Sequence, residues 1–362
     1  MTLLALMRWN LMLVGGGLAL CQQSPFVMTD LGHVERAIRG GTLAPDGRSL
    51  FTWGSGLYRW ELGNGPLGSR QPLPLNLDSF GEGGCVADVS GDGRPGIVLE
   101  QLPRDDPAAL GKLVWLEAPD WHPLVIDAGI ETSECVETSL LGHRGILMVQ
   151  RHAQVRFYPY PLAKDGHTMY QEVYSFYTPS RQAGLLQADV DGDGFADILC
   201  GNYWIKSPET YDLPWRLFAI ELYNETPASA TLRLATSNGG QDLFVAQRDM
   251  EQAKVTWFRR PADPKVLWDA HPLELQGGIH YATGLLAGSW GSDALDVLVG
   301  EHHGRDSRLL WFRKGKAAAE FTLQASTASR PIVNLLAVAG GALVLYEDGV
   351  SILRIADSGG KR

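Results

Sequence analysis

The chain has 362 residues, of which 45% are hydrophobic, and its formal net charge is −10. A chain of this size and composition buries a large core, and its negative charge disfavours non-specific binding to nucleic acid or to anionic lipid. The 42 glycines and 20 prolines are spread along the sequence, which indicates many turns and a single domain without a long linker.

The N-terminal residues have the pattern of an export signal. An apolar stretch over residues 11–20 follows Arg8, and polar residues follow Cys21 at once. The stretch is too short and too rich in glycine for a membrane span, so residues 1–21 are predicted to be a signal peptide. Residues 18–21 also resemble a bacterial lipobox, with Leu20 where a small residue is usual. Two alternatives stay open, lipidation of Cys21 and cleavage without a lipid, and both place the protein in the periplasm or at the cell surface.

Seven short apolar runs recur along the chain, and their first residues are separated by 45 to 54 residues. These runs begin at Ser49, Gly96, Gly145, Asp197, Asp242, Asp296 and Ala342. Most are followed by a second strand that ends in aromatic residues, and no unit shows a long amphipathic helix. A period of about 40 to 50 residues is typical of propeller blades or of a solenoid.

The repeat therefore predicts an all-β fold, a seven-bladed β-propeller that occupies residues 30–356 as one domain. A six-bladed ring with a cap is the alternative, because the first and last units match the others weakly. We expect residues near 30–45 to pair with the final blade around residues 342–356, which would close the ring and remove an open sheet edge.

The fourth unit contains an acidic loop over residues 188–197. Its carboxylates come from Asp189, Asp191, Asp193 and Asp197, and the main-chain carbonyl of Phe195 offers a further oxygen. Oxygen ligands at alternate loop positions are those that Ca²⁺ prefers, so the loop predicts a structural Ca²⁺ site. The alternative is a metal-free turn, since Asp-Gly pairs also accept local backbone hydrogen bonds.

The motif of this loop occurs twice, and it resembles the FG-GAP or VCBS repeat of propellers such as the integrin α-chain. Residues 87–93 and 188–194 carry the resemblance. It implies that each loop joins the innermost strand of a blade to the next strand and holds calcium. The second unit keeps Asp88, Ser90 and Asp92 but has Gly96 where Asp197 stands, so its predicted site is the weaker one.

Three cysteines remain when Cys21 is set aside, namely Cys85, Cys135 and Cys200. The interpretation we favour is that all three are small core residues. The alternative is a disulfide between Cys85 and Cys135, which occupy equivalent repeat positions. No Cys/His spacing typical of zinc or haem attachment occurs in the chain.

The repeat register places two sets of side chains near the central channel, where propellers carry their functional groups. The first set enters the innermost strands and consists of His33, Phe80, Ile130, Arg181, Thr226, His280 and Arg330. The second set follows the next strand of each unit and includes Glu100, Arg151, His152, Asn202, Tyr203, Trp204, Arg248, Glu301, His302 and His303. Such side chains suit a sugar or carboxylate pocket, and the candidates for catalysis are His280, Arg181, Glu301 and His302.

Two functional hypotheses follow. The first is an exported, calcium-stabilised propeller that acts as a binding or scaffolding module for a protein or carbohydrate partner at the cell envelope. The second is a carbohydrate-active enzyme of the polysaccharide lyase or sugar dehydratase type, with its site at the channel mouth, because FG-GAP-like propellers include such enzymes. We expect no nucleic-acid partner, and membrane contact only through a lipid on Cys21.

Overall fold

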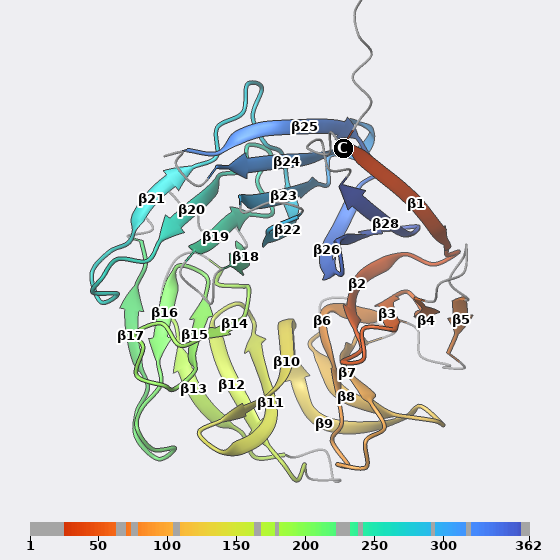
Figure 1. The fold of residues 1–362 in the computed structure, drawn as a ribbon. Coiled ribbons are helices and arrows are strands. Elements are labelled where there is room, and N and C mark those ends of the chain that lie inside the picture. Colours follow the sequence, from red (N-terminus) through yellow and green to blue (C-terminus); the bar gives the residue numbers. More distant parts are fainter. Residues whose placement is uncertain are drawn as a thin grey trace, which may run out of the picture.

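Seven four-stranded antiparallel sheets form a closed ring around a central axis in the computed structural model (Figure 1). The structure describes residues 25–62, 70–73, 79–103, 109–162, 168–177, 181–221, 232–237, 242–290, 294–315 and 320–355. The predicted signal peptide and Cys21 lie outside these residues. Within them, no helix is long and apolar enough to cross a membrane.

The first four blades follow one another along the chain, each running from its innermost to its outermost strand. Blade 1 consists of β2 (Ile38–Leu43), β3 (Ser49–Gly54), β4 (Leu57–Glu61) and β5 (Arg70–Pro72). Blade 2 consists of β6 (Phe80–Ala87), β7 (Gly96–Gln101), β8 (Gly111–Glu117) and β9 (His122–Ile130). Blade 3 consists of β10 (Thr132–Leu140), β11 (His143–Gln150), β12 (Gln154–Pro159) and β13 (Gln171–Ser175). Blade 4 consists of β14 (Leu186–Ala188), β15 (Asp197–Cys200), β16 (Tyr203–Lys206) and β17 (Arg216–Ala219).

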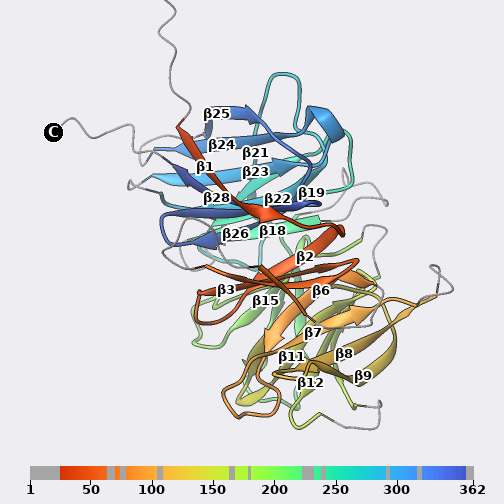
Figure 2. The same cartoon turned by 90° about the vertical axis from the view of Figure 1, so that its right-hand side faces the viewer.

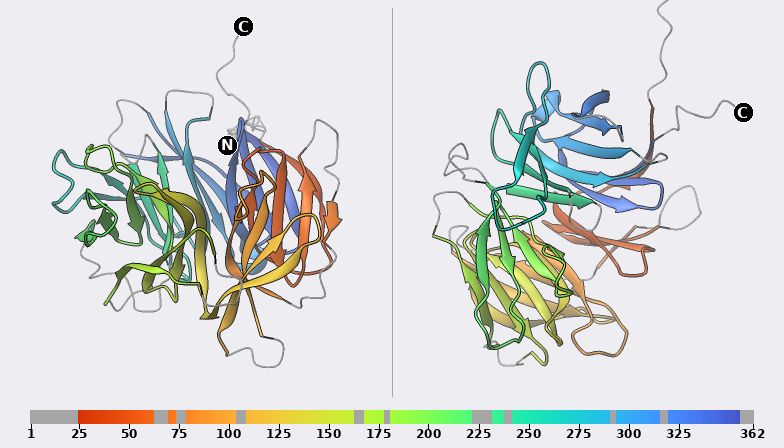
Figure 3. Two further views of the ribbon diagram at one scale, coloured as in Figure 1. Left: turned by 90° about the horizontal axis from the view of Figure 1, so that it is seen from below. Right: turned by 60° about the vertical axis from the view of Figure 1, so that its left-hand side comes forward.

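The last three blades complete the ring (Figures 2 and 3). Blade 5 consists of β18 (Leu232–Ser237), β19 (Asp242–Gln247), β20 (Val255–Arg259) and β21 (Asp269–Pro272). Blade 6 consists of β22 (Ala282–Gly288), β23 (Leu295–Glu301), β24 (Arg308–Lys314) and β25 (Thr322–Ala328). Blade 7 consists of β26 (Ile332–Val338), β27 (Gly341–Tyr346) and β28 (Gly349–Ile355), with β1 (Phe26–His33) as its outermost strand.

The predicted repeat is confirmed. The seven recurring apolar runs are the second strands of the seven blades, and each strand begins within two residues of the predicted position. The fold is therefore a seven-bladed β-propeller, and the six-bladed alternative is wrong.

The ring closes through β1, which pairs antiparallel with β28 from Phe26 opposite Ile355 to His33 opposite Gly349. The expected pairing between the start of the chain and the last blade is thus confirmed, but the closing strand is shorter and earlier than residues 30–45. Residues 38–43 form β2, the innermost strand of blade 1. With β1 paired to β28, blade 7 has four strands, like the other six blades.

The core is divided among the blade interfaces. Among the described residues, seven clusters of buried apolar side chains occur, and each combines two adjacent blades. Trp53 of blade 1, for example, packs with Phe80 and Leu99 of blade 2. Since each blade buries its faces only against its neighbours, every blade depends on the completeness of the ring.

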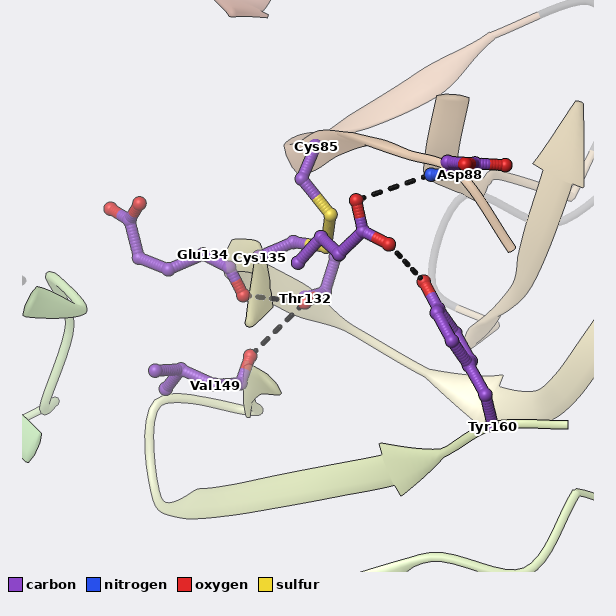
Figure 4. The surroundings of a disulfide bond; sticks show 8 residues. Cys85, Asp88, Thr132, Glu134, Cys135, Val149 and Tyr160 are labelled. Carbon is purple, nitrogen blue, oxygen red and sulfur yellow. Dashed lines mark hydrogen bonds between the residues drawn. A yellow bond between two sulfur atoms is a disulfide. The ribbon is translucent and has the colours of Figure 1, made fainter. Parts of the chain in front are cut away.

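A disulfide joins Cys85 on β6 to Cys135 on β10, and the Cα atoms are 5.3 Å apart (Figure 4). The interpretation of these two cysteines as free core residues is therefore wrong, because equivalent positions on adjacent innermost strands bring their side chains together. Cys200 is free and fully buried in blade 4, as expected for a small core residue. The disulfide links blades 2 and 3 across the channel side of their interface.

The double variant Cys85→Ala/Cys135→Ala should lower the free energy of unfolding by about 2 to 4 kcal/mol, because the bridge closes a loop of 50 residues in the unfolded chain. Thermal denaturation with and without a reductant measures the effect. The reductant should destabilise the native protein and Cys200→Ala alike, and leave the double variant unchanged. A native protein that is insensitive to reductant would show that the bridge does not form.

Candidate functional site

A polar cavity of about 320 Å³ lies where the innermost strands begin and the second strands end. Five of the seven blades, blades 1 to 5, contribute to it. We call it the mouth pocket and define it by its charged or titratable lining residues, Arg39, Glu82, Glu100, Glu131, His152, Arg181, Arg248 and Asp249. The pocket therefore combines three guanidinium groups with four carboxyl groups and one imidazole.

An ion pair spans the mouth of the ring. Arg248 Nη2 lies 2.6 Å from Glu82 Oε1, and Arg248 Nη1 pairs with the other carboxylate oxygen. Glu82 belongs to blade 2 and Arg248 follows β19 of blade 5, so the pair joins opposite sides of the central opening (Figure 1). The bidentate geometry fixes both side chains, because a guanidinium matches a carboxylate in plane and spacing.

Glu100 is the buried acid of the pocket, with 4% of its surface exposed. Its Oε2 atom accepts a hydrogen bond from the Thr132 amide at 3.1 Å. Gly81 and Gly111 make room for it, since a Cβ on Gly81 would lie 2.2 Å from Oε2 and one on Gly111 would lie 2.9 Å from Oε1. Burial raises the pKa of Glu100 to about 7, and the carboxylates of Glu131 and Glu82 add to the increase.

Glu301 lies at the end of β23 in blade 6, as Glu100 lies near the end of β7 in blade 2, but its surroundings differ. It is fully buried, accepts the His280 amide at 2.8 Å, and forms a bidentate ion pair with Arg308 whose two N–O distances are 2.6 Å. Among the described residues, no cation lies within ion-pair distance of Glu100. Of these two carboxylates, Glu301 is neutralised by an arginine, whereas Glu100 has no such partner among the described residues, and only Glu100 lines the mouth pocket.

His152 is held in the pocket by an unusual turn. Arg151 and His152 connect β11 to β12 with φ angles of 50° and 52°, a left-handed conformation that costs about 1 to 2 kcal/mol per non-glycine residue. The imidazole is buried, its Nε2 atom lies 3.6 Å from Glu131 Oε1, and its Nδ1 atom has no hydrogen-bond partner among the described residues. Burial, together with the Arg181 charge, lowers the pKa of His152 to about 4, so the ring is neutral near pH 7.

Glu131 connects these groups, because its Oε1 atom also lies 3.4 Å from Arg181 Nη2. The pocket consequently offers fixed hydrogen-bond donors and acceptors side by side, together with a carboxylic acid that retains its proton up to near-neutral pH. This combination can bind a compact polar ligand through paired hydrogen bonds, and Glu100 can donate either a hydrogen bond or a proton.

The four catalytic candidates from the sequence do not meet in one pocket. Arg181 lies in the mouth pocket. The two ring nitrogens of His280 face carbonyl oxygens, that of Gly277 at 3.0 Å from Nε2 and that of Glu251 beside Nδ1, while Glu301 is occupied by Arg308. His302 lies 3.3 Å from Glu347 of blade 7.

Some residues of the two predicted sets nevertheless lie together in the mouth pocket. Glu100, His152, Arg181 and Arg248 belong to the two predicted sets and line one pocket. Glu131 follows the predicted Ile130 by one residue, and Glu82 follows Phe80 by two, so a wider window around each strand start would have found both. Thr226 lies outside the described residues.

The acidic loop of blade 4 has a geometry that fits a cation. Asp189, Asp191 and Asp197 each bring one carboxylate oxygen within 4.8 Å of the others. Asp189 also accepts the amides of residues 192, 193 and 194, and the Phe195 amide donates to Asp193 at 3.0 Å. An ammonium group already lies beside the cluster, since Lys206 Nζ is 2.5 Å from Asp191 Oδ2 and also pairs with Asp193.

The loop of blade 2 has the same backbone framework with different charge partners. Asp88 accepts the amides of residues 91, 92 and 93, as Asp189 does in blade 4. Asp92 pairs with Arg94, and Arg144 Nη2 lies 3.7 Å from Asp88. Ser90 stands between them in the loop. Arginines therefore lie beside the two carboxylates of this loop, as Lys206 lies beside those of blade 4.

Comparison with known proteins supports the fold alone. No protein-family model and no curated protein matched the sequence. The WD40 repeats of RRP9 are similar in structure, with a TM-score of 0.56 at 12% identity over 91% of this chain and 97% of that one. The WD40 propeller of Doa1 gives 0.55 at 9% identity over 92% and 98%, and YCF48 from Cyanidioschyzon merolae gives 0.56 at 8% identity over 92% and 99%. The chain is therefore a β-propeller of ordinary size.

Glu100→Gln should change the pH dependence of stability. Folded Glu100 keeps its proton up to about pH 7, whereas the unfolded side chain loses it near pH 4.5. Its contribution to stability is thus present below pH 4.5 and is lost as the pH rises to 7, by at most about 3 kcal/mol. His152 acts in the opposite direction over an overlapping range, so the comparison must be the difference between wild type and variant.

Chemical denaturation of both proteins at pH 5 and pH 8 measures this difference. The free energy of unfolding of the wild type, relative to that of Glu100→Gln, should decrease from pH 5 to pH 8. Glu117→Gln, which alters an exposed carboxylate outside the pocket, serves as the control, and the wild type should show no such decrease relative to it. A constant difference between wild type and Glu100→Gln would mean that Glu100 is already ionised at pH 5 in the folded protein.

Proposed function

We propose that this propeller is a binding module that holds a compact, hydroxyl-rich ligand, the end of a carbohydrate, in the mouth pocket. The observation that carries the proposal is that five blades contribute to one small cavity, which is lined by Glu100, His152 and Arg181. Hydroxyl groups both donate and accept, so a sugar satisfies such a mixed lining better than a ligand with a single charge does.

Binding is favoured over catalysis because His280 and Glu301, two of the four residues first considered for catalysis, are engaged in the framework. Both ring nitrogens of His280 face carbonyl oxygens, and both oxygens of Glu301 face Arg308. One observation supports the second hypothesis, a carbohydrate-active enzyme. Glu100 and Glu131 place two carboxyl groups in one pocket, and a pKa of about 7 suits Glu100 as a proton donor.

We further propose that the protein is exported, with residues 1–21 as the signal peptide and Cys21 as the site of a lipid if an anchor is added. The Cys85–Cys135 bridge supports this placement, since structural disulfides persist in oxidising compartments such as the periplasm. The ligand is accordingly a carbohydrate or a glycosylated protein of the cell envelope. The two related Asp88 and Asp189 loops support membership of the FG-GAP or VCBS group.

The blade 4 loop is proposed to hold a structural Ca²⁺ through Asp189, Asp191, Asp193, Asp197 and the Phe195 carbonyl. The cation would compete with Lys206, because the ammonium group already pairs with two of these carboxylates. The loop keeps its backbone hydrogen bonds in either case, so calcium would add stability to this blade without creating the fold.

Lys206→Met should therefore raise the calcium affinity about tenfold or more, and calcium should raise the thermal midpoint of the variant more than that of the wild type. Calorimetric titration and melting in Ca²⁺, Mg²⁺ or EGTA provide the measurements, with the charge-preserving Lys206→Arg as the control. Equal calcium responses in all three proteins would exclude competition by Lys206. No response in any of them would refute the calcium site itself.

The ligand can be sought on a glycan array and its affinity measured by calorimetry. Arg181→Ala and Glu100→Gln should each weaken binding of the sugar by about 10- to 100-fold, because a hydrogen bond to a charged or buried group is lost. His302→Gln, outside the pocket, should bind normally. Turnover of the sugar that disappears in Glu100→Gln would favour the enzyme, whereas retained binding in both pocket variants would place the ligand elsewhere.

A further inference from the structure

A second cavity, of about 290 Å³, lies on the channel side of the innermost strands. Blades 3 to 7 contribute to it through β10, β14, β18, β22 and β26 and the residues just before β14. We call it the leucine well, because its lining includes Leu186, Leu234, Leu285, Leu286, Leu335 and Leu336. Apart from Glu134, Thr236 and Asn334, the side chains that line it are apolar.

The leucine well adjoins the mouth pocket. Consecutive residues of β10 divide between the two cavities, since Thr132 and Ser133 line the mouth pocket and Glu134 lines the well. The Glu134 side chain points away from the Cys85–Cys135 bridge (Figure 4). Glu134 lines the well and Arg248 lines the mouth pocket, and the Glu134 charge acts on Arg248 after those of Glu82 and Asp249, so the two cavities lie close together. Polar and apolar sites thus follow each other along the ring axis.

The apolar lining has an energetic consequence. Leu285 and Leu335 are buried, whereas Leu186 and Leu336 pack against the blade interfaces but are only partly buried. A ligand that covers apolar surface gains about 25 cal/mol of binding free energy for each Å² that it removes from water. Single exposed leucines are common, but here leucines from four blades line one cavity beside a polar pocket. An occupant that covers them gains free energy that a simple sugar cannot supply.

We propose that the natural ligand is amphipathic, with a sugar head in the mouth pocket and a short hydrocarbon chain in the leucine well. The inference rests on the proposed function of the mouth pocket for its head group and adds the chain. The charged rim excludes a purely apolar ligand from the mouth, and the well is too apolar to hold a longer oligosaccharide. Glycolipids and other alkylated sugars have the required chemistry.

Titration calorimetry with n-alkyl β-D-glucosides from methyl to octyl, each below its critical micelle concentration, tests the inference. The dissociation constant should fall about three- to fourfold for each added methylene and then level off when the well is full, since burial of one CH₂ contributes about 0.8 kcal/mol. Methyl glucoside serves as the probe of the head site alone.

Three variants locate the chain. Leu186→Asn makes the well polar, and Leu336→Phe fills part of it without adding polarity, so the second remains informative if the first fails to fold. Each should flatten the dependence of affinity on chain length. Leu323→Asn, at an exposed position on β25, should leave that dependence unchanged.

The outcomes separate the two proposals. If methyl glucoside binds and longer glucosides bind no more tightly, the leucine well does not hold a hydrocarbon chain, and the proposal for the mouth pocket is unaffected. A chain-length effect that survives in Leu186→Asn and Leu336→Phe would place the chain elsewhere and overturn it as well. If the affinity rises with chain length but Arg181→Ala does not weaken binding, the mouth pocket is refuted as the site of the head group. If no glucoside binds, the amphipathic ligand is refuted, and the glycan array judges the mouth pocket separately.

Discussion

Apolar contact between adjacent blades is the interaction on which the rest of the structure depends. Each of the seven core clusters belongs to two blades, so a blade that lost a neighbour would expose the apolar side chains of the cluster that they share. The pairing of β1 with β28 supplies the last of these neighbours. Closure therefore holds the innermost strands at fixed positions around the axis, and these positions determine where the channel side chains lie.

The fixed ring explains how the same strand position serves two purposes. Glu301 and Glu100 both end a second strand and both accept a backbone amide at the start of an innermost strand. Arg308 neutralises Glu301, and that carboxylate becomes part of the framework. Glu100 lacks such a partner among the described residues and stays protonated to near-neutral pH. The difference lies in one neighbouring side chain, while the backbone is shared.

Features of the fold and of the candidate site could be predicted where residues close together in the sequence encode them. The second strands follow from sequence because each is a continuous apolar run, and Asp-Gly turns precede β7 and β15. The disulfide between Cys85 and Cys135 could not be predicted from the sequence, since equivalent positions on adjacent strands suit a disulfide and a packed pair of thiols equally well. Glu82 and Arg248 are 166 residues apart, and nothing near either residue indicates that they meet. Lys206 was missed for the same reason, because its pairing with Asp191 requires the fold of β16.

Charge at the mouth and leucine below it are two results of one geometry. The ends of the innermost strands reach solvent, where Glu82 and Glu131 remain hydrated or pair with arginine, whereas the middles of the same strands face one another across the channel. Arg248 lines the mouth, and its guanidinium pairs with Glu82 from blade 2 and with Asp249 beside it in blade 5. The ion pair between Arg248 and Glu82 couples the shape of the mouth to the spacing of blades 2 and 5. The polar pocket is therefore only as rigid as the apolar interfaces that set this spacing.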